Sequence, residues 1–256
     1  MSVSDRNNKV SYRRYWLPDL AWVGGLIVVT TILFWASDID IAVARLFYSS
    51  GSPAGSFLGG ENVAWVFLED TVPFLTWGLL LGPLLIFLAG LGWKRLRPYR
   101  MHAIYILLSV ALGPGLLVNT VFKAHFGRPR PRQTIEFGGE FKYLPVLVPG
   151  RNEDCRSFAS GHSSIGFAFC VFYFLYRRKR PRLALGYLAF SIILGLVIGV
   201  ARMAVGAHFL SDVLWSGFFS YLVALVIYYF VLRVPHWEDT NGHLWLQRGV
   251  RVEELA

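Results

Sequence analysis

The chain alternates between long uncharged apolar stretches and short stretches rich in charge. Six apolar windows occur, at residues 20–37, 71–93, 101–122, 157–176, 183–201 and 213–232. Each is close to the roughly 20 residues that an α-helix needs to cross a bilayer. One such window could be a buried core helix, but six in a chain of 256 residues favour a membrane protein. The pattern predicts an all-α, polytopic membrane protein in which residues 1–256 form a single domain of six transmembrane helices.

Two shorter apolar pieces separate the first two windows. Residues 40–48 have an amphipathic pattern, and residues 63–68 are apolar throughout. Neither piece is long enough to cross the bilayer, and short amphipathic helices commonly lie in the plane of the interface. The sequence therefore predicts one or two interfacial helices between the first and second spans.

Composition agrees with the membrane class, and the distribution of charge adds an orientation. The chain is 55% hydrophobic and 16% charged, whereas soluble domains carry about 25% charged residues. The net charge of +9 is concentrated in the N-terminal segment and in loops at 94–100 and 177–182. The positive-inside rule then predicts that both termini are cytoplasmic, with residues 1–18 as the N-terminal segment and residues 235–256 as the tail. Basic residues at helix ends also argue against nucleic acid as a partner.

The loop at residues 123–156 breaks this charge rule. It holds seven lysines and arginines, although the number of preceding helices puts it on the outside. The third predicted helix ends there at Lys123, and the fourth begins near His162. The fifth ends near Arg202 and the sixth begins near Asp212, so three polar motifs are predicted to meet at the outer face. Ionisable side chains at a membrane cost free energy unless they pair or line a site, which indicates an outer-face active site.

The first motif extends from Lys123 to Pro131. Lys123 could bind a phosphate as a point charge, and an arginine could bind it as a planar fork. Arg128 and Arg130 compete for the arginine role, and Arg128 and Arg132 could also contact a larger head group. The alternative is a basic helix end whose side chains extend to the interface.

The second motif is Ser160-Gly161-His162, which opens the fourth predicted helix. A helix start offers unpaired N–H groups and a favourable dipole end to an anion. Ser160 adds a hydroxyl, Gly161 permits close approach of the backbone, and His162 adds a titratable group. The alternative is an N-cap serine followed by small residues.

The third motif contains Arg202, His208 and Asp212. His208 and Asp212 are four residues apart, so on a helix they would share one face, and the carboxylate could accept one ring N–H. Arg202 adds a bidentate cation for an anion. A satisfied core pair or half of a zinc site would have the same spacing, but zinc requires three or four ligands. We therefore predict a phosphate site with no metal and no other cofactor.

The order of the three motifs resembles the signature of the type 2 phosphatidic acid phosphatase superfamily. The matching positions are Lys123, Arg130 and Pro131, then Ser160, Gly161 and His162, then Arg202, His208 and Asp212. The resemblance covers the third to the sixth predicted helix, and the segments around residues 128–140 and 155–162 are similar to the bacterial lipid A phosphatase branch. Ala159 and Ala201 depart from the usual proline and serine, and the second departure removes a possible hydroxyl donor to phosphate.

The resemblance implies a phosphoryl transfer through a phosphohistidine at His208. Asp212 would orient His208, and His162 would protonate the leaving oxygen and later activate water. The positions that would bind the phosphate are Lys123, Arg130, Ser160, Gly161 and Arg202.

Together, these observations predict a lipid phosphatase of the bacterial inner membrane with its active site facing the periplasm. The expected partners are the bilayer and a lipid substrate: lipid A, phosphatidylglycerophosphate, phosphatidic acid or a polyprenyl phosphate such as undecaprenyl pyrophosphate. A phosphotransferase could use the same site to pass phosphate to a second lipid. A non-enzymatic transporter would instead be expected to show inverted repeats and charges near mid-membrane. The sequence leaves the oligomeric state open.

Overall fold

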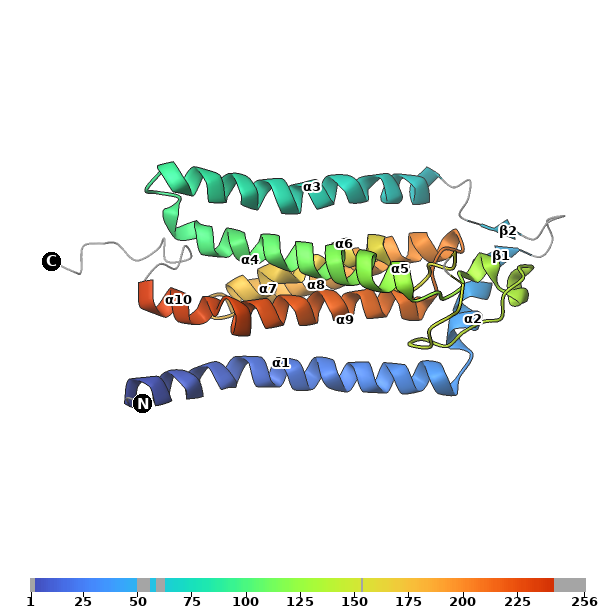
Figure 1. Cartoon of the computed structure of the whole chain (residues 1–256), viewed down its shortest axis with the longest axis horizontal. Coiled ribbons are helices and arrows are strands. Elements are labelled where there is room, and N and C mark those ends of the chain that lie inside the picture. The colour runs from blue at the N-terminus through green and yellow to red at the C-terminus, as the bar shows by residue number, and fades with distance from the viewer. Residues whose placement is uncertain (1–2, 50–55, 59–62, 153, 242–256) are drawn as a thin grey trace.

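The computed structural model describes the backbone of residues 3–49, 56–58, 63–152 and 154–241, and side chains from residue 15 onward. Residues 242–256, which make up most of the predicted tail, lie outside these ranges. The described chain is mostly helical, with a long loop region between α5 and α6 (Figure 1).

The longest helices are α1 (Val3–Ala36), α3 (Val63–Gly92), α8 (Pro181–Ala204) and α9 (Leu210–Val226). A further long rod consists of η1 (Arg97–Tyr99), α4 (Arg100–Val110), η2 (Ala111–Phe122) and α5 (Lys123–His125). The shorter helices are α2 (Ile39–Arg45), α6 (Gly161–Ala168), α7 (Cys170–Tyr176), η5 (Ile227–Val231) and α10 (Val234–Asn241). The loops contain η3 (Pro131–Gln133), η4 (Ile135–Phe137) and an antiparallel pair of short strands, β1 (Tyr48–Ser49) and β2 (Ser56–Phe57).

Five helical segments are long and apolar enough to cross a membrane. They are Tyr15–Ala36, Val63–Gly92, Arg97–His125, Pro181–Ala204 and Leu210–Val231. They correspond to five of the six predicted windows. The remaining window, the fourth along the chain, contains the apolar but shorter segment Gly161–Tyr176. It is shorter than predicted because Ser157 and Ser160 lie in a loop, where their N–H groups donate to the carbonyls of Arg128 (3.0 Å) and Asp212 (3.3 Å). The fold is that of an all-α polytopic membrane protein.

Only one of the two predicted interfacial pieces is a separate element. Residues 39–45 form the short helix α2, whereas Val63–Leu68 is the beginning of α3 and continues without a break through Glu69 and Asp70. Val63–Leu68 is therefore the first part of α3 rather than a separate interfacial helix.

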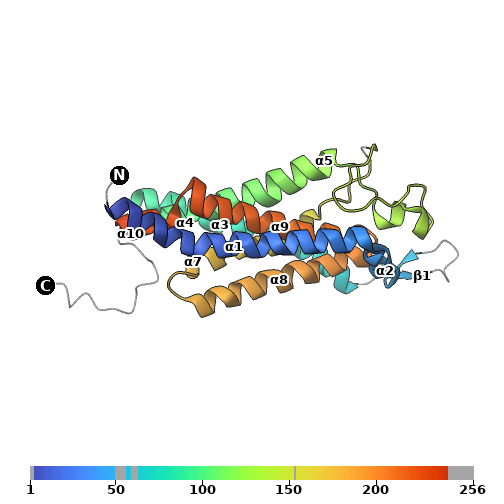
Figure 2. The ribbon, with the colours of Figure 1, turned by 90° about the horizontal axis from the view of Figure 1, so that it is seen from below.

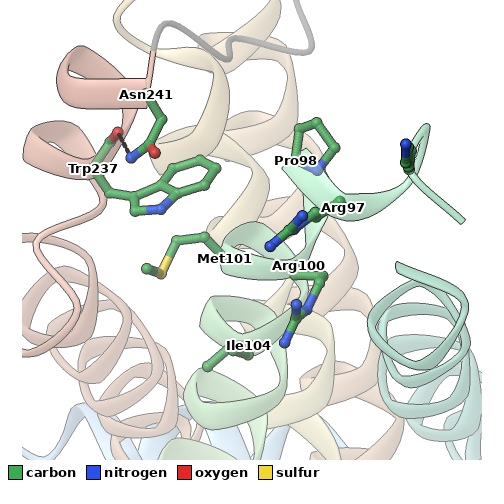
Figure 3. A pocket seen from close by; sticks show the side chains of 8 residues that line it. Arg97, Pro98, Arg100, Met101, Ile104, Trp237 and Asn241 are labelled. Atoms are coloured by element: carbon green, nitrogen blue, oxygen red, sulfur yellow. Dashed lines mark hydrogen bonds between the residues drawn. The ribbon is translucent and has the colours of Figure 1, made fainter. Parts of the chain in front are cut away.

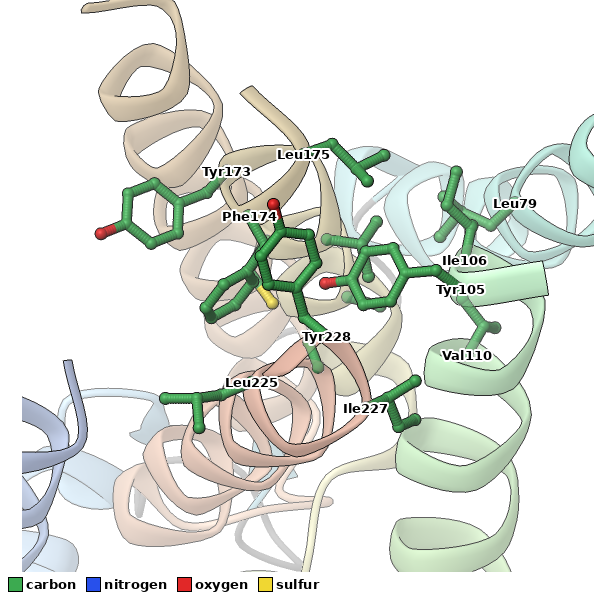
Figure 4. Packing of buried hydrophobic residues seen from close by; sticks show 14 of the residues in the cluster. Leu79, Tyr105, Ile106, Val110, Tyr173, Phe174, Leu175, Leu225, Ile227 and Tyr228 are labelled. Atoms are coloured by element: carbon green, nitrogen blue, oxygen red, sulfur yellow. The ribbon is translucent and has the colours of Figure 1, made fainter. Parts of the chain in front are cut away.

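The side chains sort into a lipid-like exterior and a packed interior. Large apolar side chains on the outer helices are exposed, among them Trp22 and Val29 on α1 and Phe74 and Leu85 on α3. Inside, an aromatic cluster joins α4, α7 and η5 (Figure 4). The ring of Tyr228 there lies 5.3 Å from that of Tyr105 and 5.7 Å from that of Phe174. Exposed apolar helices around a tight core are what a bilayer, rather than water, stabilises.

The two ends of the bundle differ in construction. Figures 1 and 2 show α2, β1 and α5 gathered at one end, and α10 with the turn between α3 and α4 at the other. We call these the α5 end and the α10 end. All three polar motifs of the sequence lie at the α5 end.

The helix that leads to the α5 end has an unusual winding. Residues Ala111–Phe122 are π-helical, and Pro114 lies inside this segment. Proline has no N–H to donate and disturbs the ladder of backbone hydrogen bonds. The side chain of Asn119 donates to the Pro114 carbonyl at 2.7 Å. This places the Asn119 amide next to the start of α6.

Candidate active site

The structure brings the three motifs together at the α5 end. Lys123 lies on α5, Arg130 precedes η3, His162 begins α6, Arg202 is in the last turn of α8, and His208 is in the α8–α9 loop. Both histidines lie so close to Lys123, Arg130 and Arg202 that the three positive charges disfavour protonation of the two rings. Two imidazoles are therefore surrounded by three cations that come from separate parts of the chain.

His208 does not lie on a helix, and its partner differs from the predicted one. The loop turns at Gly206, which has a φ of +64° that glycine adopts readily. His208 is 3% exposed, and its Nδ1 lies 2.7 Å from the Ser157 carbonyl oxygen but 4.0 Å from Asp212. The predicted direct pair of His208 with Asp212 on one helix face was therefore wrong. Since a carbonyl only accepts, Nδ1 carries the proton and Nε2 is left with its lone pair.

The surroundings of His208 favour its neutral form. Burial lowers the pKa of His208 well below its ordinary value of 6.5, and the positive charge of Arg202 lowers it further, against the hydrogen bond to Ser157. A neutral imidazole with a free Nε2 lone pair is the form that can act as a nucleophile.

Asp212 supports His208 through an intermediate residue. Its Oδ2 accepts hydrogen bonds from the Ser157 hydroxyl at 2.6 Å and from the Phe209 N–H at 2.8 Å. The Ser157 carbonyl in turn accepts from His208. Asp212 thus caps the start of α9 and fixes both chain segments that hold the imidazole.

Arg128 is part of the same buried support, which corrects its predicted role as a head-group contact. Its side chain is 0% exposed, its Nη1 contacts Asp212, and its Nη2 donates to Asp40 on α2 at 2.9 Å. Nη1 also donates to Ser211 at 2.8 Å. Burial alone would lower the pKa of Arg128, but the charges of Asp212 and Asp40 outweigh it and raise the pKa. With two carboxylate partners inside the protein, Arg128 is not available to an external phosphate.

The start of α6 is shaped by its cap and by a close contact. The Ser160 hydroxyl accepts from the Ser163 N–H at 3.4 Å and shares a hydrogen bond with the Ser163 hydroxyl at 2.8 Å. Ser160 is fully buried, so the structure shows its hydroxyl as an N-cap rather than as a group free to bind phosphate. A Cβ at Gly161 would lie 2.2 Å from Asn119 Oδ1, so a larger residue there would displace the Asn119 side chain. The first N–H groups of α6 have no partner within the helix.

Glu69 is a polar member of the site that sequence reasoning missed. It lies on α3, its Oε1 is 3.8 Å from His162 Nε2, and its Oε2 contacts Arg202. The motif around His162 contains no acidic residue, so it gives no indication of this partner. Glu69 lies close to a predicted helix in the sequence. Only the packing of α3 against α6 and α8, however, brings it to His162 and Arg202.

Arg130 and Arg132 lie on the open side of the site. Both are at least partly exposed. Arg132 lies close enough to Arg130 and Arg202 for its positive charge to repel theirs. Burial lowers the pKa of Arg130, and its cationic neighbours lower it further. An anion bound beside Arg130 would therefore stabilise its charged form.

A cavity of about 330 Å³ connects this site with the apolar surface between α3, η2 and α6. Val72, Leu80 and Ile165 line its apolar part, and Lys123 and His162 line its polar part. The arrangement can accommodate an amphiphile with its charged group at the cations.

Comparisons with known proteins agree with the geometry. Residues 102–235 match the PAP2 superfamily. The chain is 33% identical to a lipid A 4'-phosphatase of Francisella tularensis subsp. novicida over 77% of this chain and 87% of that protein. It is 34% identical to a lipid A 4'-phosphatase of Rhizobium leguminosarum, over 72% and 83%, and 33% identical to a lipid A 1-phosphatase of Rhizobium etli, over 59% and 65%. No solved structure matches the chain significantly.

Proposed function

Because the chain belongs to the PAP2 superfamily, we propose that it is a membrane lipid phosphatase that hydrolyses a phosphate of lipid A or of a related head group. The observation that carries this proposal is the neutral, buried His208 close to Lys123, Arg130 and Arg202. Among the described residues, only Arg202 of these three cations contacts a carboxylate, that of Glu69. The names of the relatives favour lipid A over phosphatidylglycerophosphate, phosphatidic acid and undecaprenyl pyrophosphate.

In the first step, Nε2 of His208 attacks phosphorus opposite the lipid oxygen. A P–N bond forms as the P–O bond breaks, and the electron pair stays on the leaving oxygen. His162, as an imidazolium, gives its proton to that oxygen. Burial and the charge of Arg202 lower the pKa of His162 to about 4, and Glu69, 3.8 Å from its Nε2, opposes this lowering. A bound anionic phosphate beside the ring would favour the imidazolium further.

In the second step, water attacks the phosphohistidine and the P–N bond breaks. The now neutral His162 takes a proton from this water, which restores both histidines. Lys123, Arg130 and Arg202 neutralise the equatorial oxygens in both steps, and the first N–H groups of α6 add to this stabilisation. Three fixed cations supply the charge that Mg²⁺ supplies elsewhere, so the reaction is proposed to need no metal.

The orientation is proposed on the distribution of charge. The basic loops at 94–100 and 177–182 lie toward the α10 end, and the positive-inside rule puts this end in the cytoplasm. The α5 end with the active site then faces the periplasm.

The direct test is phosphate release by the purified protein in detergent with EDTA, from a panel containing lipid A and the other three lipids. We expect release that survives chelation, is strongest for lipid A and is absent from His208→Ala. Release that EDTA abolishes and Mg²⁺ restores would contradict the metal-free step. Transfer of the phosphate to an added acceptor lipid in place of water would indicate a phosphotransferase.

A further inference from the structure

A second cavity, of about 560 Å³, lies at the α10 end of the molecule, away from His162 and His208 (Figure 3). It is lined by the turn between α3 and α4, the first turn of α4, and α10. Figure 3 shows Trp237 of α10 on one side and Arg97 and Arg100 on the other, with Met101 between them.

The basic side chains of this cavity have no carboxylate partner among the residues that the structure describes. Lys94, Arg97 and Arg100 line it, and in the described part of the chain none of the three is paired with a carboxylate. The Nε of Arg100 is buried and finds no hydrogen-bond partner among the described residues. Neighbouring arginines at the same end differ, because Arg177 is paired with Asp19 and Arg178 with Glu238. Unpaired cations around a cavity favour an anionic ligand.

The other walls of the cavity are apolar and firmly held. Met101, Ile104 and Trp237 contribute apolar surface. Trp237 is fixed because α10 is anchored by Glu238, which accepts from Arg178 at 3.1 Å and lies 3.0 Å from His102 Nε2. The His102 ring also packs edge-on against Trp237 at 5.6 Å. A formed apolar wall next to a cationic rim fits a ligand with a charged head and an apolar tail.

The position in the bundle identifies the class of such a ligand. Leu88, Leu91 and Trp93, at the end of α3 next to the cavity, are all exposed large apolar side chains. The cavity volume is within the range of small-molecule sites and much larger than a free phosphate ion requires. We propose that this cavity binds the phosphodiester head of an anionic membrane phospholipid, in the leaflet opposite the active site, with its acyl chains along Met101 and Ile104. Basic pockets between membrane helices bind anionic lipid heads by the same combination of charges and apolar contacts.

The test is native mass spectrometry of the protein after detergent exchange from nanodiscs that contain equal amounts of phosphatidylglycerol and phosphatidylcholine. We expect one phosphatidylglycerol retained in preference to phosphatidylcholine. Arg97→Gln should lower this retention about fivefold. The matched control is Arg95→Gln, because Arg95 is an exposed arginine of the same turn that does not line the cavity. Arg95→Gln should retain phosphatidylglycerol as the unchanged protein does.

Equal losses from the two variants, or equal retention of the two lipids, would overturn the proposal, because either result would show only general attraction to negative charge. Displacement of the lipid by millimolar inorganic phosphate would overturn the lipid assignment in favour of a site for the free ion. Thermal unfolding of each variant in detergent shows whether the fold is kept. If Arg97→Gln does not keep the fold, Lys94→Gln replaces it and carries the same expectation. The readout does not depend on phosphatase activity, so the experiment is also done on His208→Ala protein.

Discussion

Two groups of cations at the α5 end have opposite surroundings. Behind His208, Arg128 is fully buried between Asp40 and Asp212. In front of it, Arg130 is partly exposed and has cations as neighbours. A buried charge that is compensated within the protein holds the fold, whereas a charge left uncompensated beside a cavity can bind an anion. The two arginines are two residues apart, and only their partners separate their roles.

The largest expected effect concerns His208, the proposed nucleophile, which lies between the two groups of cations. We expect His208→Ala to lower turnover roughly 10⁴-fold or more, because removing a nucleophile abolishes the covalent route. His125→Ala is the control, since His125 is exposed at the same end and bonds only to the Val121 carbonyl of its own helix among the described residues. Similar rates for the two variants, measured by phosphate release, would contradict the assignment of His208.

The sharpest test of the comparison exchanges each arginine for glutamine. Arg130→Gln should lower kcat/KM by about 10²-fold, the usual effect of losing one group that stabilises transition-state charge, with little change in thermal stability. Arg128→Gln should lower the free energy of unfolding by about 3–5 kcal/mol, because it leaves two buried carboxylates without their cation. Thermal unfolding in detergent and steady-state kinetics on both variants measure the two effects. If Arg128→Gln folds normally and only loses activity, the division between the two arginines is wrong.

Asp40 provides a smaller test of the buried side. Asp40→Asn keeps the shape but removes the charge that Arg128 and the Ser211 N–H contact. We expect a loss of about 2 kcal/mol in stability, the typical value for a hydrogen bond to a charged group. Activity at a temperature well below unfolding should change less than in Arg130→Gln. The same assay on Glu136→Gln, an exposed acid of η4, serves as the control.

The smallest expected effect concerns pH. Since the pKa of His208 is lowered from 6.5 in the folded protein, protonation of this residue should reduce kcat/KM only below pH 6.5. The unfolded chain binds this proton more readily than the folded one, so the contribution of His208 also makes stability fall as pH drops through 6.5. A pH–rate profile of kcat/KM measures the first effect. An acidic limb centred above 6.5 and assigned to His208 would contradict the buried, neutral imidazole.

Much of the fold could be predicted from the chain, because long uncharged windows have few alternatives to a membrane helix. Five of the six windows qualify by length and composition, and the polar motifs meet at one end as their order along the chain predicted. The family could also be predicted, since the spacing of the motifs is specific.

The partners within the site could not be predicted in the same way. Arg128 and Arg130 have the same chemistry, and only the position of α2 gives Arg128 its partner Asp40. The spacing of His208 and Asp212 suggested a helix, but Gly206 turns the chain so that His208 bonds to Ser157 instead. Glu69 contacts Arg202 although the two residues lie far apart in the sequence. Hydrophobic patterns carry information about elements, whereas these contacts depend on how the elements pack.

The most direct test of the central claim is the stereochemical course at phosphorus. The substrate would be a lipid phosphorothioate made chiral with oxygen isotopes, hydrolysed in isotopically labelled water. Attack by His208 followed by attack by water involves two in-line displacements, so our account predicts retention of configuration. Inversion would show that water attacks the lipid phosphate directly, and would contradict the two-step mechanism through His208.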